Sequence, residues 1–358
     1  MTNTPGKSTG YMRQLDGLRA VAVIAVAVFH WHHPVVFGVP LRLGSAGVNL
    51  FFVLSGFLIT GILINVRERI GDDTRARIVA LKAFWVRRFL RLAPALLFYL
   101  AVIYPLGYLD DKDGLLWYVA YLGNFRIAEI ERWPSGVGHL WSLAVEEQFY
   151  LFIPLLVLWI KPQRLGHVLL AGTVISLVAR GLWAESWARI LPPAAFVGLF
   201  VGCGCAVLFQ REDARRVGDR LSRFGTPVLV IAMLATGLES FSSGVAFTVA
   251  WLLYNLGAAG MVWRAANDQA SSCYSWAPMV WLGRLSYGAY LWHFFASWLF
   301  DALVPGVPGP VRFVGAGVIT CAMAKISMDL IEQRFIDKKT RYPYVKRVEA
   351  AQTSPAKP

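Results

Sequence analysis

Charged residues are scarce in this chain of 358 residues: Asp, Glu, Lys and Arg together make up 16% of it, whereas soluble proteins carry about 25%. A soluble chain of this size would need far more polar surface to cover its core. Cysteine is also rare, with four residues, none of them spaced as in a zinc knuckle. The composition argues against an ordinary soluble domain, and the cysteines indicate neither a disulfide framework nor a metal site.

Hydrophobic residues make up 56% of the chain and gather in long runs, many of about 18–22 residues, a length that crosses a bilayer as a helix. We therefore expect an all-α fold, a polytopic membrane helix bundle with about ten transmembrane helices. The expected spans are 18–36, 44–65, 92–109, 139–160, 167–184, 192–209, 226–240, 244–263, 282–304 and 311–331. A further apolar run at 115–125 is too short to cross and is expected to be re-entrant or interfacial.

Basic residues set the expected orientation. The net charge of +13 is compatible with nucleic-acid binding, but most of the 35 Lys and Arg residues lie between the apolar runs, so no nucleic-acid partner is expected. Placing both termini in the cytoplasm puts most of these residues on the inner side, as the positive-inside rule requires. Lys7 and Arg13 precede the first run as in a signal peptide, but no convincing cleavage site follows. We interpret this run as a retained span.

Ionisable residues inside a span need a reason, because each costs about 2.5–3.5 kcal/mol on insertion scales. His30 lies on the same helical face as Arg19, three turns deeper, and His32 and His33 follow at the outer end. His293 falls near the middle of another span, on one face with Ser286 and Tyr290. Each histidine is either hydrogen-bonded in a polar interior or a catalytic base.

Two adjacent carboxylates, Glu146 and Glu147, lie two turns into the fourth expected span. They point about 100° apart on a helix, so at least one is expected to face the bundle. Ser142, Glu146 and Tyr150 share a face. The alternative is a helix start that dips only into the lipid headgroups.

Two further clusters carry charge. Arg87, Arg88 and Arg91 stand at the cytoplasmic start of the third expected span, where they either anchor the helix at the interface or clamp a phosphate, since arginine forks match phosphate oxygens. Lys325 and Asp329 are four residues apart in the last span, and we expect a structural ion pair there.

Five segments, in order, give the chain a family resemblance. They are LDGLR at 15–19 with His30, GVNLFFVLSGF at 47–57, RRFLRLAP at 87–94, WSLAVEEQFY at 141–150 and SYGAYLWH at 286–293. In these segments the chain resembles the acyltransferase-3 family of membrane O-acyltransferases, which modify bacterial surface glycans. The chain departs from the family pattern at Asn49, where an acidic residue is common, and at Arg334, where a proline is common.

The resemblance implies an enzyme of the bacterial inner membrane that transfers an acyl group, usually acetyl, from cytoplasmic acyl-coenzyme A (acyl-CoA) to a hydroxyl of a glycan or glycosylated lipid. It maps the family's paired functional groups onto Arg19 with His30 and onto Arg88 with Arg91. The expected domain organisation is one transmembrane acyltransferase domain at 1–340 and a disordered cytoplasmic tail at 341–358.

Site roles follow from the charged residues and the resemblance together. We expect catalysis from Arg19, His30, Glu146, Glu147 and His293, donor binding by Arg87, Arg88 and Arg91, and substrate binding by Ser142, Tyr150, Ser286 and Tyr290. Direct transfer with His30 as general base is favoured, because no nucleophile-elbow motif is present. Two alternatives stay open: a transporter or flippase of a lipid-linked sugar, and an acyl translocator that serves a separate secreted transferase. No pattern specifies an oligomeric state.

Overall fold

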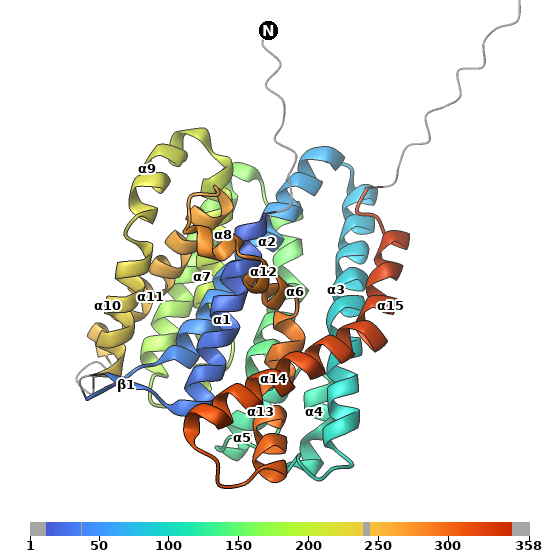
Figure 1. Cartoon of the computed structure of the whole chain (residues 1–358). Coiled ribbons are helices and arrows are strands. Elements are labelled where there is room, and N and C mark those ends of the chain that lie inside the picture. Colours follow the sequence, from blue (N-terminus) through green and yellow to red (C-terminus); the bar gives the residue numbers. More distant parts are fainter. Residues whose placement is uncertain (1–11, 37, 239–243, 346–358) are drawn as a thin grey trace, which may run out of the picture.

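The computed structural model describes residues 12–36, 38–238 and 244–345, and these residues form a bundle of helices (Figure 1). A two-stranded hairpin of β1 (Val35–Val36) and β2 (Val39–Pro40) is the one sheet in this part of the chain. The helices are α1 (Arg13–His32), α2 (Leu43–Ile70), α3 (Thr74–Ile103), α4 (Leu115–Val119), α5 (Gly123–Ile130), α6 (Trp141–Trp159), α7 (Pro162–Leu182), α8 (Val197–Gln210), α9 (Glu212–Ser222), α10 (Gly225–Gly237), α11 (Gly244–Ala266), α12 (Ala277–Arg284), α13 (Ser286–Leu303), α14 (Gly309–Ser327) and α15 (Gln333–Ile336). The expected helical bundle is confirmed.

Six stretches of helix in the described residues are long and apolar enough to cross a membrane. They are Arg13–His32, Leu43–Ile70, Gly138–Trp159, Pro162–Leu182, Gly244–Ala266 and Gly309–Arg341. The four other expected spans overlap α3, α8, α10 and α13. Of these, α8 and α10 are apolar but short, the first half of α3 is rich in Arg and Lys, and α13 contains His293 and Asp301. The chain is therefore a helical membrane protein, while ten spans and cytoplasmic termini stay predictions.

Two expected spans have different boundaries in the structure. The third was expected at 92–109, but α3 begins at Thr74, where the Asp73 carboxylate caps the helix by accepting from the backbone N–H groups of Arg75 and Ala76. The ninth was expected at 282–304 as one helix, but the chain breaks at Leu285 into α12 and α13. The expected tail, 341–358, lies outside the described residues from 346 onward.

The segment before α13 is in close backbone contact with α1. A Cβ atom at Gly283 of α12 would lie 1.8 Å from the carbonyl oxygen of Asp16 in α1, and one at Gly17 would lie 1.9 Å from that of Tyr274. Glycine is needed at both positions because any larger residue would push the backbones apart. The segment around α12 is thereby packed tightly against the first turns of α1.

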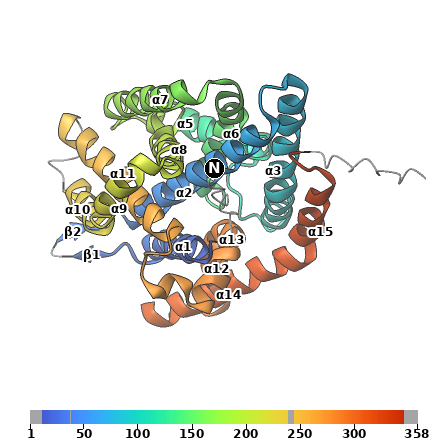
Figure 2. The same cartoon turned by 90° about the horizontal axis from the view of Figure 1, so that it is seen from above.

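Helix α2 lies near the middle of the bundle when it is seen from above, with α1, α6 and α8 around it (Figure 2). The periphery on one side is formed by α14 and α15, and on another by α7 and α10 (Figure 2). One large core cluster includes Phe52 of α2, Tyr99 of α3, Phe149 of α6 and Trp292 of α13. Five helices, α1, α2, α3, α6 and α13, thus meet where the candidate site lies.

The short helices α4 and α5 are held by a buried carboxylate. Asp111 accepts hydrogen bonds from the Tyr118 hydroxyl at 2.8 Å and from Arg126 Nε and Nη2 at 3.0 and 2.9 Å. The hydrogen bonds from Arg126 lower the pKa of Asp111 below its ordinary value of 3.8. The apolar run expected to be re-entrant or interfacial is thus two short helices joined by this cluster.

Replacing this carboxylate should destabilise the protein. We expect Asp111→Asn to lower the thermal unfolding midpoint at neutral pH by a few degrees, because the amide cannot pair with Arg126. A carboxylate with a lowered pKa stabilises the fold above its unfolded pKa, and that contribution is lost as the pH falls through the lowered value. The difference from wild type should therefore shrink as the pH falls below about 3.8, and it should disappear below the lowered pKa of Asp111. Thermal scans by tryptophan fluorescence would measure it.

The matched control is Asp110→Asn, which removes the partly exposed pair with Arg132. Exposed pairs contribute little, so this variant should unfold close to wild type. Equal losses in the two variants, or a difference that persists in acid, would contradict the assignment to Asp111.

Candidate active site

A cavity of about 210 Å³ lies between α1, α2, α3, α6 and α13. Seven of the residues expected to form the site line it: Arg19, Arg88, Arg91, Ser142, Glu146, Ser286 and Tyr290. They come from four helices that are far apart in the sequence. The helical spacing proposed from the sequence explains each helix's contribution, since residues three or four apart share a face. The convergence of the four helices is a property of the fold.

One side of the cavity is positively charged. Arg88 and Arg91 lie one turn apart on α3, and Arg19 comes from α1. Arg19 pairs with Asp16, whereas Arg88 stacks over the ring of Tyr150 at 4.1 Å and Arg91 is exposed at the cavity. Three cations outnumber the two carboxylates nearby, Asp16 and Glu146, and leave a net positive field that favours an anionic ligand.

Arg87 does not line this cavity. Its Nη1 atom donates to the carbonyl oxygens of Lys339 and Tyr342 at 2.9 and 3.2 Å, and its guanidinium lies 4.8 Å from the ring centre of Tyr344. Adjacent residues point about 100° apart on a helix, so Arg87 and Arg88 face different neighbours. The structure separates Arg87, which holds the C-terminal segment against α3, from the other two arginines.

The two glutamates also separate. Glu146 faces the cavity and accepts hydrogen bonds from Ser55 of α2 and from the Tyr150 hydroxyl, the latter at 3.0 Å. Glu147 is not among the lining residues, and its Oε1 atom is buried without a hydrogen-bond partner among the described residues. Tyr150, expected to bind substrate, instead touches Glu146 and Arg88. Ser55 was missed in the sequence, although it lies within the 47–57 segment.

Ser142 and Tyr290 meet at another wall of the cavity. The Ser142 Oγ and Tyr290 hydroxyl oxygens are 2.6 Å apart, and the Tyr290 hydroxyl donates to the His139 carbonyl oxygen at 2.9 Å. Both side chains line the cavity, and both residues are buried. The ring of Tyr290 also contacts the rings of His139 and His293, each with a centroid separation of 5.5 Å. Tyr290 therefore joins the cavity to a group of histidines.

Three histidines, His30, His139 and His293, form this group. His293 Nε2 lies 3.2 Å from His30 Nδ1, and the His139 and His293 rings have centroids 5.1 Å apart. His293 Nδ1 lies 2.6 Å from the carbonyl oxygen of Tyr290, which can only accept. In the neutral pair, His293 Nδ1 therefore carries the proton, His293 Nε2 accepts from His30 Nδ1, and His30 Nε2 keeps a lone pair. The expected convergence of His30 and His293 is found, although neither lines the cavity.

His139 was missed in the sequence. It is buried, and neither of its ring nitrogens has a hydrogen-bond partner within the described part of the chain. The available signal was its place two residues before Trp141, at the start of the 141–150 segment. His32 is exposed and its ring centroid lies 6.1 Å from that of Phe313. Lys325 Nζ lies 2.6 Å from Asp329 Oδ1, which confirms the expected ion pair.

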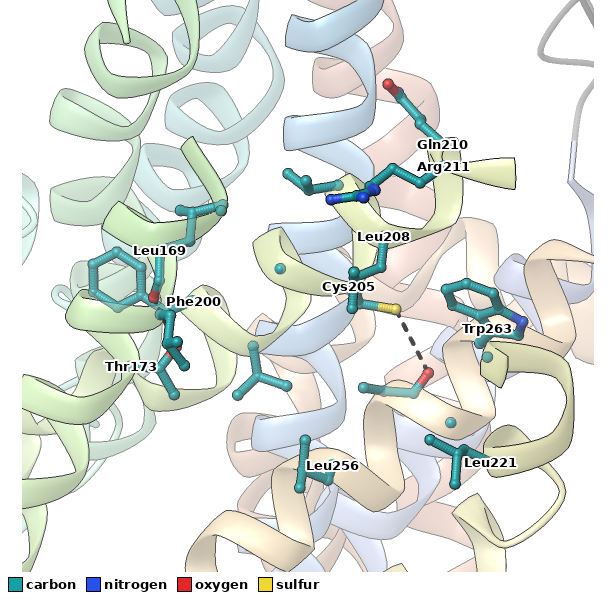
Figure 3. A pocket seen from close by; sticks show the side chains of 18 of the residues that line it. Leu169, Thr173, Phe200, Cys205, Leu208, Gln210, Arg211, Leu221, Leu256 and Trp263 are labelled. Carbon is teal, nitrogen blue, oxygen red and sulfur yellow. Dashed lines mark hydrogen bonds between the residues drawn. The ribbon is translucent and has the colours of Figure 1, made fainter. Parts of the chain in front are cut away.

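A larger groove of about 1340 Å³ lies between α2, α7, α8, α9, α10 and α11. Its wall is mostly aliphatic and aromatic, with Leu169, Phe200, Leu208, Leu221 and Leu256 among the side chains in Figure 3. It contains none of the residues expected to form the site. The groove is larger than the cavity, and Glu68, His167 and Cys205 are among its lining residues. His167 and Cys205 each contact a backbone carbonyl oxygen, of Gln163 and Ala259 respectively, so they do not form the linked acid, base and nucleophile of an active site.

Comparison with known proteins places this arrangement in a family. A model of the acyltransferase-3 family, described as an acyltransferase domain, matches residues 12–326. The chain is 31% identical to the peptidoglycan O-acetyltransferase OatA of Listeria monocytogenes over 338 residues, which cover 82% of this chain and 50% of the relative. No solved structure matches the chain.

Two further relatives carry names that assign an O-acetyltransferase activity without establishing it. YrhL of Bacillus subtilis, named for peptidoglycan O-acetylation, is 30% identical over 366 residues, covering 90% of this chain and 54% of its own. An O-acetyltransferase homologue of Staphylococcus aureus is 27% identical over 374 residues, covering 93% and 58%. The chain thus spans a little over half the length of these relatives. With the family model matched over nearly all of its described residues, the chain belongs to the acyltransferase-3 family of membrane acyltransferases.

Proposed function

We propose that this chain is a membrane O-acetyltransferase that moves an acetyl group from cytoplasmic acyl-CoA to a hydroxyl of a cell-envelope glycan on the outer side of the plasma membrane. The observation that supports this most is the single cavity that joins Arg88, Arg91 and Glu146 to Tyr290, which in turn contacts His293. The names of the relatives support acetyl as the acyl group and peptidoglycan as the kind of acceptor.

The arginines suit the donor. Acyl-CoA carries phosphates, and guanidinium groups bind phosphate oxygens through paired, charge-assisted hydrogen bonds. The cavity, at about 210 Å³, is smaller than the pockets of about 300–1,000 Å³ that hold drug-sized ligands. It is therefore sized for the thioester end of the donor, with the nucleotide end left outside near Arg91.

The histidine pair suits the transfer step. In the proposed reaction the acceptor oxygen attacks the thioester carbonyl carbon while His30 Nε2 takes the proton from the hydroxyl. The new C–O bond forms, the C–S bond breaks, and the proton then passes to the departing thiolate. His293 keeps His30 in the required tautomer through the contact of 3.2 Å.

Purified protein in lipid vesicles tests the function. With acetyl-CoA labelled in the acetyl group and an N-acetylglucosamine oligomer as acceptor, we expect label on the oligomer together with free CoA thiol. Sugar movement without any thiol release would favour the transporter or flippase. Thiol release that yields acetyl on the outer side, but an ester on the oligomer only after a separate transferase is added, would favour the acyl translocator.

A further inference from the structure

The outer ends of the helices carry seven basic residues in the predicted orientation, contrary to the usual preference for basic residues on the inner side. Three of them have carboxylate partners: Arg126 pairs with Asp111, Arg132 with Asp110 and Arg312 with Asp301. Three others, Arg42, Arg180 and Arg189, form no ion pair with any residue that the structure describes. The presence of three arginines without a carboxylate partner at this end of the bundle needs a physical reason.

The three unpaired arginines are neighbours. Arg180, in the last turn of α7, donates from Nη1 to the carbonyl oxygen of Arg189 at 2.8 Å. Burial lowers the pKa of Arg189, and the charge of Arg42, the residue before α2, lowers it further. Arg42 joins the other two through α11, because its carbonyl oxygen accepts from the Tyr254 hydroxyl at 3.4 Å and the Tyr254 ring stacks on Trp251. Like charges near one another repel, and the partial burial of Arg180 and Arg189 removes water that would screen them. A bound anion would relieve both costs.

Aromatic rings fix the guanidinium groups. Arg180 Cζ lies 4.0 Å from the ring centre of Trp251, and Arg189 Cζ lies 5.7 Å from that of Trp187. Such contacts hold a cation in place while its N–H edges stay available. The Nε atom of Arg180 is buried with no hydrogen-bond partner in the described ranges. A preorganised donor without an acceptor is what an anion-binding site requires.

The cluster begins at the depth of the histidine pair. Gly44, two residues after Arg42, lies so close to Phe29 that a Cβ atom there would be 2.5 Å from Phe29 Cδ1. Phe29 directly precedes His30. The first turn of α2 therefore packs beside the end of α1 that carries His30, at the outer end of the bundle. A ligand held by Arg42 and Arg189 would lie on the side from which an acceptor reaches the enzyme.

We propose that Arg42, Arg180 and Arg189 bind an anionic group, a carboxylate or a phosphate, of the acceptor glycan. This inference rests on the proposed function and adds the charge of the acceptor to it. The site selects acceptors by a charge at a distance from the hydroxyl that is acylated, so a neutral glycan binds more weakly.

Binding of two tetrasaccharides to the full chain in phosphatidylcholine nanodiscs tests this site. One is a neutral N-acetylglucosamine tetramer, and the other alternates N-acetylglucosamine with N-acetylmuramic acid, which adds carboxylates. We expect wild type to prefer the carboxylated tetramer, and Arg42→Gln and Arg189→Gln to raise its Kd about tenfold or more each. The Kd of the neutral tetramer should not change, and high salt should reduce the preference.

Arg132→Gln is the matched control, because it removes an outer arginine that already has a carboxylate partner. Arg180 is half-buried, so a neutral substitution there could unfold the protein, and Arg180→Lys is used because it keeps the charge. This variant should lose part of the preference for the carboxylated tetramer, because a lysine cannot form the paired hydrogen bonds of an arginine. A preference for the carboxylated tetramer that survives in Arg42→Gln and Arg189→Gln would overturn the site. A second arm adds phosphatidylglycerol to the nanodiscs. If these arginines retain that lipid but have no effect on tetramer binding, the anion is a lipid headgroup and the proposal is overturned.

The outcomes separate this inference from the proposed function. Transfer of acetyl with arginine-independent binding would leave the function standing and remove the anion site. Binding of the carboxylated tetramer that depends on the arginines, without any transfer from acetyl-CoA, would support the anion site and contradict the proposed function.

Discussion

His30→Ala should reduce acetyl transfer to background while the protein still inserts and folds. Removing a general base costs about 10²–10⁴-fold in rate, and here it also removes the ring that contacts both His293 and Phe294. The loss should appear in kcat, with the requirement for acetyl-CoA little changed, because His30 does not line the donor cavity. Label transfer by purified protein under saturating donor would measure it.

His32→Ala is the control for this experiment. His32 is on the same helix two residues on, but it is exposed and its partner is Phe313, so transfer should stay close to wild type. His293→Ala should be intermediate, because His30 then loses the acceptor that sets its tautomer but keeps its own lone pair. Substantial transfer by folded His30→Ala protein would sink the assignment and move the base to His293.

Arg91→Gln should raise the acetyl-CoA concentration needed for half-maximal rate by about 10–100-fold, the cost of losing a charge-assisted hydrogen bond to the donor. Arg91 is the informative position because it is exposed at the cavity, so its replacement leaves the packing of α3 intact. Arg88→Gln would also remove the contact with Tyr150 and mix a binding effect with a packing effect. Initial rates at varied donor concentration measure the change.

Arg87→Gln separates donor binding from simple anchoring of α3. Arg87 is one turn before Arg91 and has the same charge, but it bonds to backbone carbonyls near the C-terminal end. If the cavity binds the donor, Arg87→Gln should change the donor requirement far less than Arg91→Gln. Equal effects of the two substitutions would mean that the arginines act as a general anchor at the membrane surface.

Several parts of the site could be predicted from the sequence, because they depend on the geometry of one helix. Arg88 and Arg91 share a face of α3, as do Ser142 and Glu146 on α6, and all four line the cavity. Helical spacing indicated the face of Ser142 and Glu146, whereas the pairing of Arg88 with Arg91 came from the family resemblance. Similar depth in the expected spans made a shared cavity possible, but contacts between distant helices have no local signal, so only the fold shows which faces meet.

Other parts could not be predicted, for reasons that lie in the packing. Ser55 looked like one more small residue in an apolar helix, and its role depends on where Glu146 lies. His139 is the first residue of the expected span 139–160, where spacing gives no sign of a partner, and the fold buries it against His293. Helical spacing places both Arg87 and Arg88 one turn from Arg91; the family resemblance singled out Arg88, and the contact of Arg87 with the C-terminal segment is visible only in the fold.

The number of membrane spans also cannot be settled from hydropathy. Apolar runs in the sequence predict ten spans, whereas six helices among the described residues are long and apolar enough to cross a membrane, and α3, α8, α10 and α13 do not meet the same measure. A hydropathy average under-reports a functional helix, because polar groups of the site lower the average, as His293 does in α13.

The contact between Ser142 and Tyr290 also bears on the energy supply of the cell. A bacterial plasma membrane stores energy as a proton gradient, and any continuous file of water through a protein would discharge it. Here the arginine-lined cavity and the histidine pair are divided by the packed side chains of Tyr290 and Ser142, with Trp292 and His293 buried behind them. With the cavity proposed to face the cytoplasm and His30 proposed to face outward, this packing leaves the histidine pair outside the lining of the cavity, as a membrane that stores a proton gradient requires.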